Sequence, residues 1–491
     1  MNHSQKIRFG VKWTAIAMVT TQILRFLTTI VLARLLVPEL FGLVAMANTV
    51  IHIISVIREF GLGSAYIQRR IRGAEDARLA ASTTFYVLCM INAVMFVAAW
   101  FLAPLAASFF REAVLVDVFR VLILSLVLDA AITTSGVVLQ KDMEFGKYAV
   151  TEIIGRLSYS LISISLALLG FGVWSLVFGQ LGAQIVRTGI SIKLSGWRPA
   201  PVFSTEIARE LFSFGKYLWG FSILSALGDS LDRIIIGRWL GAGTLGVYGL
   251  ALNLSKLPAT QISRMINRIA FPALSRIQDD KAALRRVFRK TLNHVAPISL
   301  PVGLALSATA DGLVATLYGE NWAGAAPVLE VLAIYGTALS LSGLTGPVFK
   351  AIGKPNVLLY TSVLHHTLMA VLLIILARYG IVAIAWAVLI PLLVSSAIAF
   401  VLVARYLDLQ ARDLLEPLLR SGSAALIMYL TIQALEWFVG PAKLSSPLLF
   451  LACIGVGMLS YLLASLITNR AVMHEVTVSF REVMLARGKL L

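Results

Sequence analysis

Long apolar stretches recur along the whole 491-residue chain and limit the folds that it can adopt. Fourteen stretches of about 20 residues, separated by Pro, Gly and charged residues, are each long enough to cross a bilayer as a helix. Hydrophobic residues make up 58% of the chain and charged residues only 14%, with a mean hydropathy of +0.86, a balance that no soluble fold of this length tolerates. The sequence therefore predicts an all-α polytopic membrane protein. The expected spans are 13–37, 41–60, 79–103, 114–139, 150–170, 173–192, 217–240, 246–270, 291–310, 326–349, 357–377, 381–404, 421–438 and 447–468.

Lys and Arg residues outside these spans gather in alternate connecting segments. With the N-terminus in the cytoplasm, the cytoplasmic segments hold 28 of them and the outer segments hold 3. Because basic loops stay on the cytoplasmic side, this bias predicts that both termini are cytoplasmic. The same placement explains the net charge of +17 without a nucleic-acid partner.

Charged residues inside the spans indicate where the protein interior lies. The segment Leu227–Leu240 (LGDSLDRIIIGRWL) carries Asp229, Asp232 and Arg233 within an arc of about 100° on a helix, with Arg238 opposite. A charge at bilayer depth costs at least about 2.5 kcal/mol, so the first three are expected to face other helices or a water-filled cavity. Spans one and eight have similar polar arcs, and the three arcs together predict a shared aqueous cleft. The two further arcs comprise Thr21, Gln22, Arg25, Thr28 and Thr29, and Asn253, Lys256, Thr260, Arg264, Asn267 and Arg268.

An internal repeat relates the two halves of the chain. Phe9-Gly10 recurs as Phe214-Gly215, and residues 32–47 align with residues 237–251 at an offset of 204. Six spans, an even number, separate the copies, so the halves run in the same direction and are expected to be related by an axis along the membrane normal. The predicted organisation is an N-terminal lobe (1–195), a cytoplasmic linker (196–216), a C-terminal lobe (217–405) and a C-terminal helix pair with a tail (406–491).

Four motifs resemble those of the polysaccharide transporter branch of the multidrug/oligosaccharidyl-lipid/polysaccharide exporter superfamily, and of its Wzx-type flippases of the colanic-acid exporter kind. They are LARLLVPELFGLVAMA (32–47), GLGSAYIQ (61–68), DRIIIGRWLGAGTLGVYGLALNLSKLP (232–258) and FPALSRIQDD (271–280). The resemblance implies two six-helix lobes around a central cavity that opens alternately to either face. It also implies an undecaprenyl-diphosphate-linked oligosaccharide as cargo, with membrane lipids, and a polysaccharide polymerase and export machinery, as further partners.

Five basic residues are the candidate cavity residues because their cations suit the diphosphate and the polar sugars of such a cargo. An Arg guanidinium donates two parallel hydrogen bonds to phosphate. The five are Arg25, Arg187, Arg233, Lys256 and Arg264.

Structural pairing is the competing interpretation of the charges inside the spans. Two roles are open for the acidic residues Asp129, Asp229 and Asp232: they carry a coupling proton or sodium ion, or they only pair with the arginines and hold them in position. Pairing is preferred for Arg156, which has Glu152 one helical turn earlier.

Enzymatic activity is not expected from this chain. It has no GxxxxGK[ST] loop, no HExxH motif and no Ser/His/Asp arrangement, and its connections are too short for a catalytic domain, so neither a cofactor nor a metal site is predicted. The predicted function is translocation of the lipid-linked oligosaccharide across the bacterial inner membrane by alternating access. One alternative is a cation-coupled multidrug exporter, which would be expected to have an acidic cavity for its cationic substrates. The excess of arginine inside the spans argues against it. The other, a membrane polysaccharide polymerase or glycosyltransferase, needs a substantial extramembrane domain.

Replacing Arg25 or Arg233 by Ala tests the cavity assignment. Each variant is expected to block polysaccharide export, since each removes a cation that would neutralise the diphosphate, while membrane insertion stays intact. Export is measured as polysaccharide outside the cell, and insertion by the amount of protein in the membrane fraction. Normal export from both variants would remove these residues from the cavity.

Overall fold

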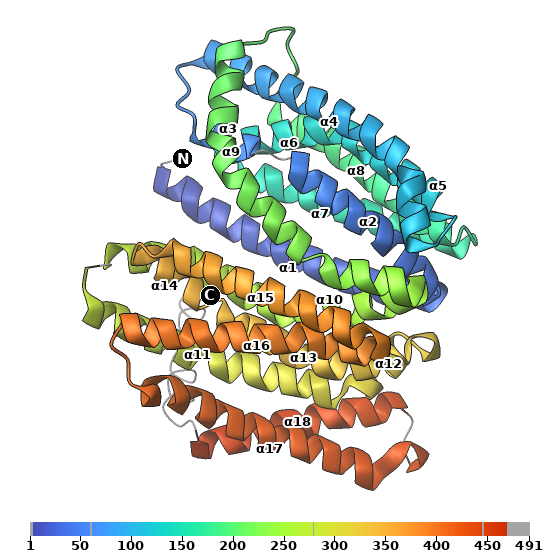
Figure 1. Cartoon of the computed structure of the whole chain (residues 1–491), viewed down its shortest axis with the longest axis vertical. Coiled ribbons are helices and arrows are strands. Elements are labelled where there is room, and N and C mark those ends of the chain that lie inside the picture. The colour runs from blue at the N-terminus through green and yellow to red at the C-terminus, as the bar shows by residue number, and fades with distance from the viewer. Residues whose placement is uncertain (1–2, 59–60, 278, 444–445, 469–491) are drawn as a thin grey trace, which may run out of the picture. The chain divides into compact units, whose positions relative to one another are not determined.

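The computed structural model describes residues 3–58, 61–277, 279–443 and 446–468. Within these ranges, the stretches 3–12, 214–225, 258–273 and 440–443 are described by their backbone alone. Every regular element in the described ranges is helical (Figure 1). The first half comprises α1 (His3–Leu35), α2 (Pro38–Arg58), α3 (Leu62–Gln68), α4 (Ala74–Phe110), α5 (Leu115–Ile123), α6 (Ser125–Lys141), α7 (Phe145–Leu168), α8 (Val173–Ser195), α9 (Thr205–Gly228) and α10 (Leu231–Arg276). The second comprises α11 (Lys281–Ala308), α12 (Ala310–Leu317), η1 (Glu320–Trp322), α13 (Ala325–Ser342), α14 (Thr345–Ala351), α15 (Pro355–Leu376), η2 (Ala377–Tyr379), α16 (Ile381–Tyr406), α17 (Ala411–Lys443) and α18 (Ser446–Thr468).

Ten helical segments of the described chain are long and apolar enough to cross a membrane, or eleven if α11 and α12, which meet at a bend of 68°, form one span. The polytopic membrane class is therefore confirmed, with fewer qualifying spans than the fourteen expected. The expected span 114–139 is divided between α5 and α6 at Leu124. The expected span 173–192 forms α8, which contains Arg187 and two Gln residues and is not among the ten.

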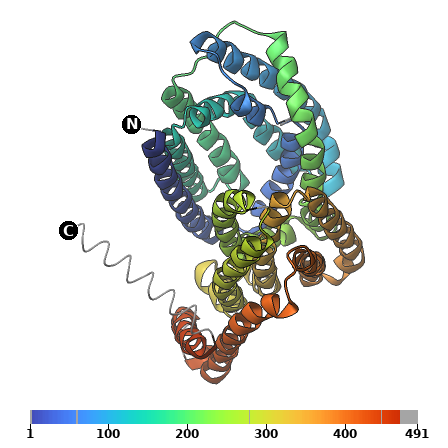
Figure 2. The ribbon, with the colours of Figure 1, turned by 90° about the vertical axis from the view of Figure 1, so that its left-hand side faces the viewer.

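The helices of each unit lie alongside one another (Figure 2), and small polar side chains join them at several contacts. Thr28 on α1 shares a hydrogen bond of 2.6 Å with Ser160 on α7, and Ser135 on α6 shares one of 2.7 Å with Ser191 on α8. Small side chains let helix backbones approach closely, which replaces the hydrophobic driving force that is missing in lipid. Large apolar side chains point outward instead, such as Phe101, which is 77% exposed.

The segment 227–240 does not form one continuous helix, contrary to the prediction. α9 ends at Gly228 and α10 begins at Leu231, so Asp229 and Ser230 lie in a break between two helices. A second interruption follows at Gly241, where a φ of 84° and a ψ of 178° kink α10. A left-handed φ suits glycine, which has no Cβ to clash with the backbone. The arc calculated for Asp229, Asp232 and Arg233 on a single helix therefore does not apply.

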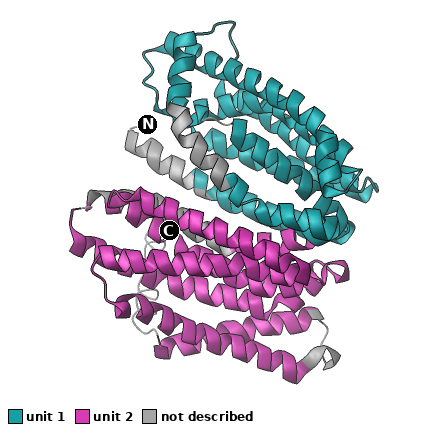
Figure 3. Cartoon of the chain, in the orientation of Figure 1, with its two compact units in different colours: residues 1–246 teal, residues 247–491 magenta. Residues whose placement is uncertain are grey.

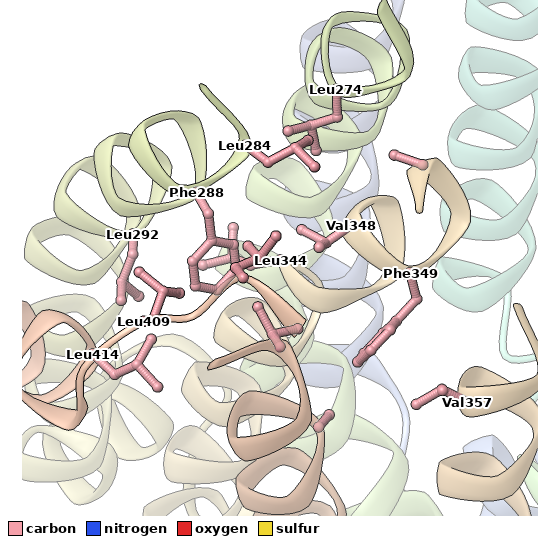
Figure 4. Close-up of a cluster of buried hydrophobic side chains, with 14 of the residues drawn as sticks. Leu274, Leu284, Phe288, Leu292, Leu344, Val348, Phe349, Val357, Leu409 and Leu414 are labelled. Carbon is pink, nitrogen blue, oxygen red and sulfur yellow. The ribbon is translucent and has the colours of Figure 1, made fainter. Parts of the chain in front are cut away.

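The chain divides into two compact units, residues 1–246 and 247–491 (Figure 3). The segment 196–216, expected to be a linker, packs within the first unit. Trp197, Ile207 and Leu211 are buried in a cluster with residues of α3, α4 and α6, and the Ala200 amide donates to Ser82 Oγ at 3.1 Å. In the second unit, an apolar cluster that includes Phe288 of α11 joins residues of α14 and α16, as drawn in Figure 4.

The repeat has a structural counterpart inside the first unit. A Cβ added at Gly42 would lie 1.7 Å from the carbonyl oxygen of Ala242, and one at Gly246 would lie 2.0 Å from that of Pro38. At the offset of 204, Gly42 matches Gly246 and Pro38 matches Ala242, so the two contacts are reciprocal. Reciprocal contacts are the pattern that a two-fold axis produces. Both glycines are needed because backbone occupies the space that any side chain would take.

Gly42→Ala is expected to lower the free energy of unfolding by about 1–3 kcal/mol, since the Ala242 backbone must move to admit a methyl group. The control is Gly189→Ala on α8, where the added Cβ meets nothing within 4 Å and the better helix propensity of Ala is neutral or slightly stabilising. Thermal unfolding of the purified proteins in detergent gives the comparison. Equal Tm values for the two variants would show that the contact at Gly42 is not close-packed.

Candidate functional site

One face of α7 carries a row of polar and charged side chains. Tyr148, Glu152, Arg156 and Tyr159 follow one another at spacings of four, four and three residues, so their side chains lie on the same side of the helix. α1 and α8 both pack along α7. Side chains from three helices therefore meet along this face.

Arg187 from α8 forms an ion pair with Oε1 of Glu152, and their side chains are 35% and 33% exposed. The Tyr148 hydroxyl interacts with both partners. Gly155 makes this geometry possible, because a Cβ there would lie 3.1–3.3 Å from the Cβ, Cγ and Cδ atoms of Arg187. Arg187 Nε is buried without a hydrogen-bond partner among the described residues. The guanidinium is thus held in place with a donor left over.

Arg25 and Arg156 lie on the neighbouring part of the same face. The Arg156 guanidinium carbon is 5.5 Å from the centre of the Tyr159 ring, and the charges of both arginines act on the Tyr159 hydroxyl. The hydrogen bond between Thr28 and Ser160 fixes α1 against α7 one turn away from Arg25. We call Arg25, Glu152, Arg156 and Arg187 the α7 charge cluster. With three cations and one anion, the cluster favours an anionic ligand.

The expected pairing of Glu152 with Arg156 is not what the structure contains. Glu152 instead pairs with Arg187, which has no carboxylate four residues away on its own helix. The expectation considered only positions one turn away on the same helix, whereas the partner comes from the adjacent helix. Arg156 was therefore missed as a member of the cluster, and no local signal in the sequence distinguishes it from a paired arginine.

Asp129 belongs to a separate buried network in the first unit. Its carboxylate pairs with Arg58 of α2, and Arg58 also donates to Asn92 Oδ1 of α4 at 3.2 Å. Asn92 in turn donates to the Leu126 carbonyl at 3.0 Å, and Thr133 donates to Asp129 at 3.1 Å. Of the two roles considered for Asp129, charge pairing is the one that this geometry matches. The partner, Arg58, lies 71 residues away in the sequence.

The acidic residues around the helix break have different environments. Asp229 is exposed in the break, whereas Asp232 is 6% exposed and its Oδ1 accepts a 2.8 Å hydrogen bond from the Arg233 amide. That bond is made by the Arg233 backbone, and the Arg233 side chain is half-buried. The guanidinium carbon of Arg238 lies 5.6 Å from the centre of the Phe109 ring.

Two of the five candidate cavity residues lie in the second unit. The Lys256 ammonium is 5.7 Å from the centre of the Tyr335 ring of α13. Arg264 lies on α10 in the stretch whose side chains are outside the description. Within the described residues, no group of three His, Cys, Asp or Glu side chains could hold a metal ion.

The helices of the described chain define a polytopic, all-helical membrane protein with ion pairs inside its first unit. A family model described as "Polysaccharide biosynthesis protein" matches residues 31–327, and the chain belongs to this family. The resemblance to the polysaccharide transporter branch is thereby confirmed.

Three curated relatives carry names from polysaccharide biosynthesis or its transport. Lipopolysaccharide biosynthesis protein WzxC of Escherichia coli K12 is 28% identical over 370 residues, 73% of this chain and 72% of WzxC. Teichuronic acid biosynthesis protein TuaB of Bacillus subtilis is 26% identical over 361 residues, 73% of this chain and 74% of TuaB. Succinoglycan biosynthesis transport protein ExoT of Rhizobium meliloti is 28% identical over 365 residues, 74% of this chain and 73% of ExoT.

Two kinds of solved structure share the fold. The lipid II flippase MurJ, in an inward closed conformation, superposes with a TM-score of 0.75 at 16% identity, over 94% of this chain and 99% of MurJ. An inward-facing MATE-family multidrug transporter of the MOP superfamily superposes with a TM-score of 0.60 at 18% identity, over 81% of this chain and 98% of the transporter. These likenesses establish the fold.

Asp129→Ala is expected to destabilise the protein by about 3–5 kcal/mol, because it leaves the buried Arg58 guanidinium without its counter-ion. The double variant Arg58→Met with Asp129→Ala removes both charges and is expected to recover most of that loss. Thermal unfolding of the three proteins in detergent measures both effects. If the double variant were as unstable as Asp129→Ala, the unpaired charge would not be the cause.

Proposed function

We propose that this protein translocates an undecaprenyl-diphosphate-linked oligosaccharide repeat unit across the bacterial inner membrane, for exopolysaccharide or lipopolysaccharide biosynthesis. The observation that carries the proposal is the α7 charge cluster, in which the guanidinium groups of Arg25 and Arg156 lie near Tyr159 on the same face of α7 as the Arg187–Glu152 ion pair. A diphosphate linked to sugars is an anionic ligand of the kind that such a cluster binds. The names of WzxC, TuaB and ExoT support the polysaccharide part of the proposal.

In the proposed mechanism, Arg25 and Arg156 receive the diphosphate, and Arg187 contributes its remaining donors. Several separate cations neutralise the headgroup without a single tight clamp, so the headgroup can leave on the opposite side. Translocation proceeds by alternating access of two six-helix lobes, in an architecture of fourteen spans with both termini in the cytoplasm. The charge bias of the connecting segments and the parallel repeat support this arrangement.

The residues outside the α7 charge cluster have proposed roles as well. Arg233, Lys256 and Arg264 add cations to the path of the headgroup. Asp229 and Asp232 lie next to the interruption between α9 and α10, where they carry a coupling ion or hold Arg233. A multidrug transporter of the MATE family shares the fold, but cationic drugs are repelled by the three guanidinium groups of the α7 charge cluster.

Arg156→Ala tests this function at a residue for which the sequence alone favours structural pairing. The variant is expected to reduce polysaccharide export at least tenfold and to accumulate the sugar-loaded lipid in the inner leaflet, because the headgroup loses one of its neutralising cations. The measurements are export of labelled polysaccharide and leaflet-specific labelling of the lipid-linked sugar. The matched control is Arg198→Ala, an exposed arginine between α8 and α9, which is expected to export normally. Wild-type export from Arg156→Ala would contradict the proposed role of the cluster.

A further inference from the structure

We propose that Glu152 is the resident counter-ion of the α7 charge cluster: its carboxylate holds Arg187 between substrates and competes with the incoming diphosphate for that guanidinium. This inference rests on the proposed function and deepens it. It assigns a positioning and release role to an acidic residue within a cation-rich site.

The ion pair leaves Arg187 able to bind a second anion. A guanidinium has five N–H donors, and Glu152 is bound through one terminal nitrogen of Arg187. The buried Nε has no acceptor among the described residues. That nitrogen is enclosed, but the side chain as a whole is 35% exposed, so an arriving phosphate oxygen can accept from terminal N–H groups that Glu152 does not occupy.

The stem of Arg187 cannot easily swing away when a substrate arrives. Its Cβ, Cγ and Cδ atoms lie against Gly155, at distances of 3.1–3.3 Å from the position of a Cβ there. The guanidinium therefore stays near Glu152 whether or not a ligand is bound. As a result, the carboxylate and the phosphate compete for one fixed group.

Charge repulsion then links binding to release. A phosphate held by Arg187 lies within a few ångströms of the Glu152 carboxylate, and like charges at that distance repel strongly where water is scarce. Glu152 thus weakens diphosphate binding and restores its own ion pair as the headgroup leaves. The exposure of both side chains, about one third, leaves room for this exchange. The Arg58–Asp129 pair, with side chains 10% and 22% exposed and three further hydrogen bonds around it, is too enclosed for the same role.

Glu152→Gln separates the charge of this side chain from its size. The full-length protein is purified in lipid nanodiscs and titrated with geranylgeranyl diphosphate, with geranylgeraniol as the probe that lacks phosphate. Glu152→Gln is expected to bind the diphosphate about tenfold more tightly, mainly through slower dissociation, and to export less polysaccharide in cells. Binding of geranylgeraniol is expected to be unchanged.

Two control variants accompany this test: one keeps the carboxylate at position 152, and the other removes a carboxylate outside the cluster. Glu152→Asp keeps the charge, and Glu144→Gln removes an exposed carboxylate that precedes α7 and lies 3.8 Å from Lys147. Both are expected to bind the diphosphate within about twofold of the wild-type protein. Glu152→Ala provides a second uncharged variant if Glu152→Gln does not elute as a monodisperse protein, and it must show the same gain in affinity.

The outcomes distinguish this inference from the proposed function. Unchanged or weaker diphosphate binding by the uncharged variants overturns the counter-ion role, while the proposed function stands if Arg156→Ala still weakens binding. If the wild-type protein binds the diphosphate no better than geranylgeraniol, and Arg156→Ala exports normally, the proposed function itself fails. If Glu152→Gln binds the diphosphate more tightly but releases it at the wild-type rate, the proposed role of Glu152 in release is also overturned.

Discussion

The cost of placing a charge among transmembrane helices is the constraint on which the interior of the first unit depends. A guanidinium at this depth needs a carboxylate, an aromatic ring, a backbone carbonyl or water around it. Arg58 and Arg187 have carboxylates from other helices, and Arg156 has the ring of Tyr159. The two carboxylate partners each join two helices, so the charges of the candidate site also determine the packing that surrounds it.

Small residues make these charge contacts geometrically possible. Gly155 admits the stem of Arg187 to the surface of α7, and Gly42 and Gly246 admit the backbone of the segments they contact. Pairs of small hydroxyl side chains, such as Thr28 with Ser160, join α1 to α7 at close range. In a bilayer, where apolar side chains gain little by leaving lipid, close approach and hydrogen bonding replace the hydrophobic effect as the source of helix association.

The two ion pairs inside the first unit differ in how far their neighbours enclose them. Arg58 and Asp129 are enclosed by Asn92 and Thr133, which hydrogen-bond to them from α4 and α6. Arg187 and Glu152 are one third exposed and lie beside two further arginines. The sequence offers no means of telling these pairs apart, because their partners are 71 and 35 residues apart and lie on different helices.

The sequence by itself determined the membrane class, the family resemblance and the repeat, because hydropathy and the offset of 204 are properties of the order of residues. From their depth in the spans it also predicted that Arg25 and Arg187 line a cavity. Only the tertiary structure decided that Glu152 pairs with Arg187 and that Arg156 joins the cluster. It also placed the helix break at Asp229 and showed that the segment 196–216 packs against α3, α4 and α6. These outcomes depend on which helix lies beside which, and helical periodicity describes only one helix at a time.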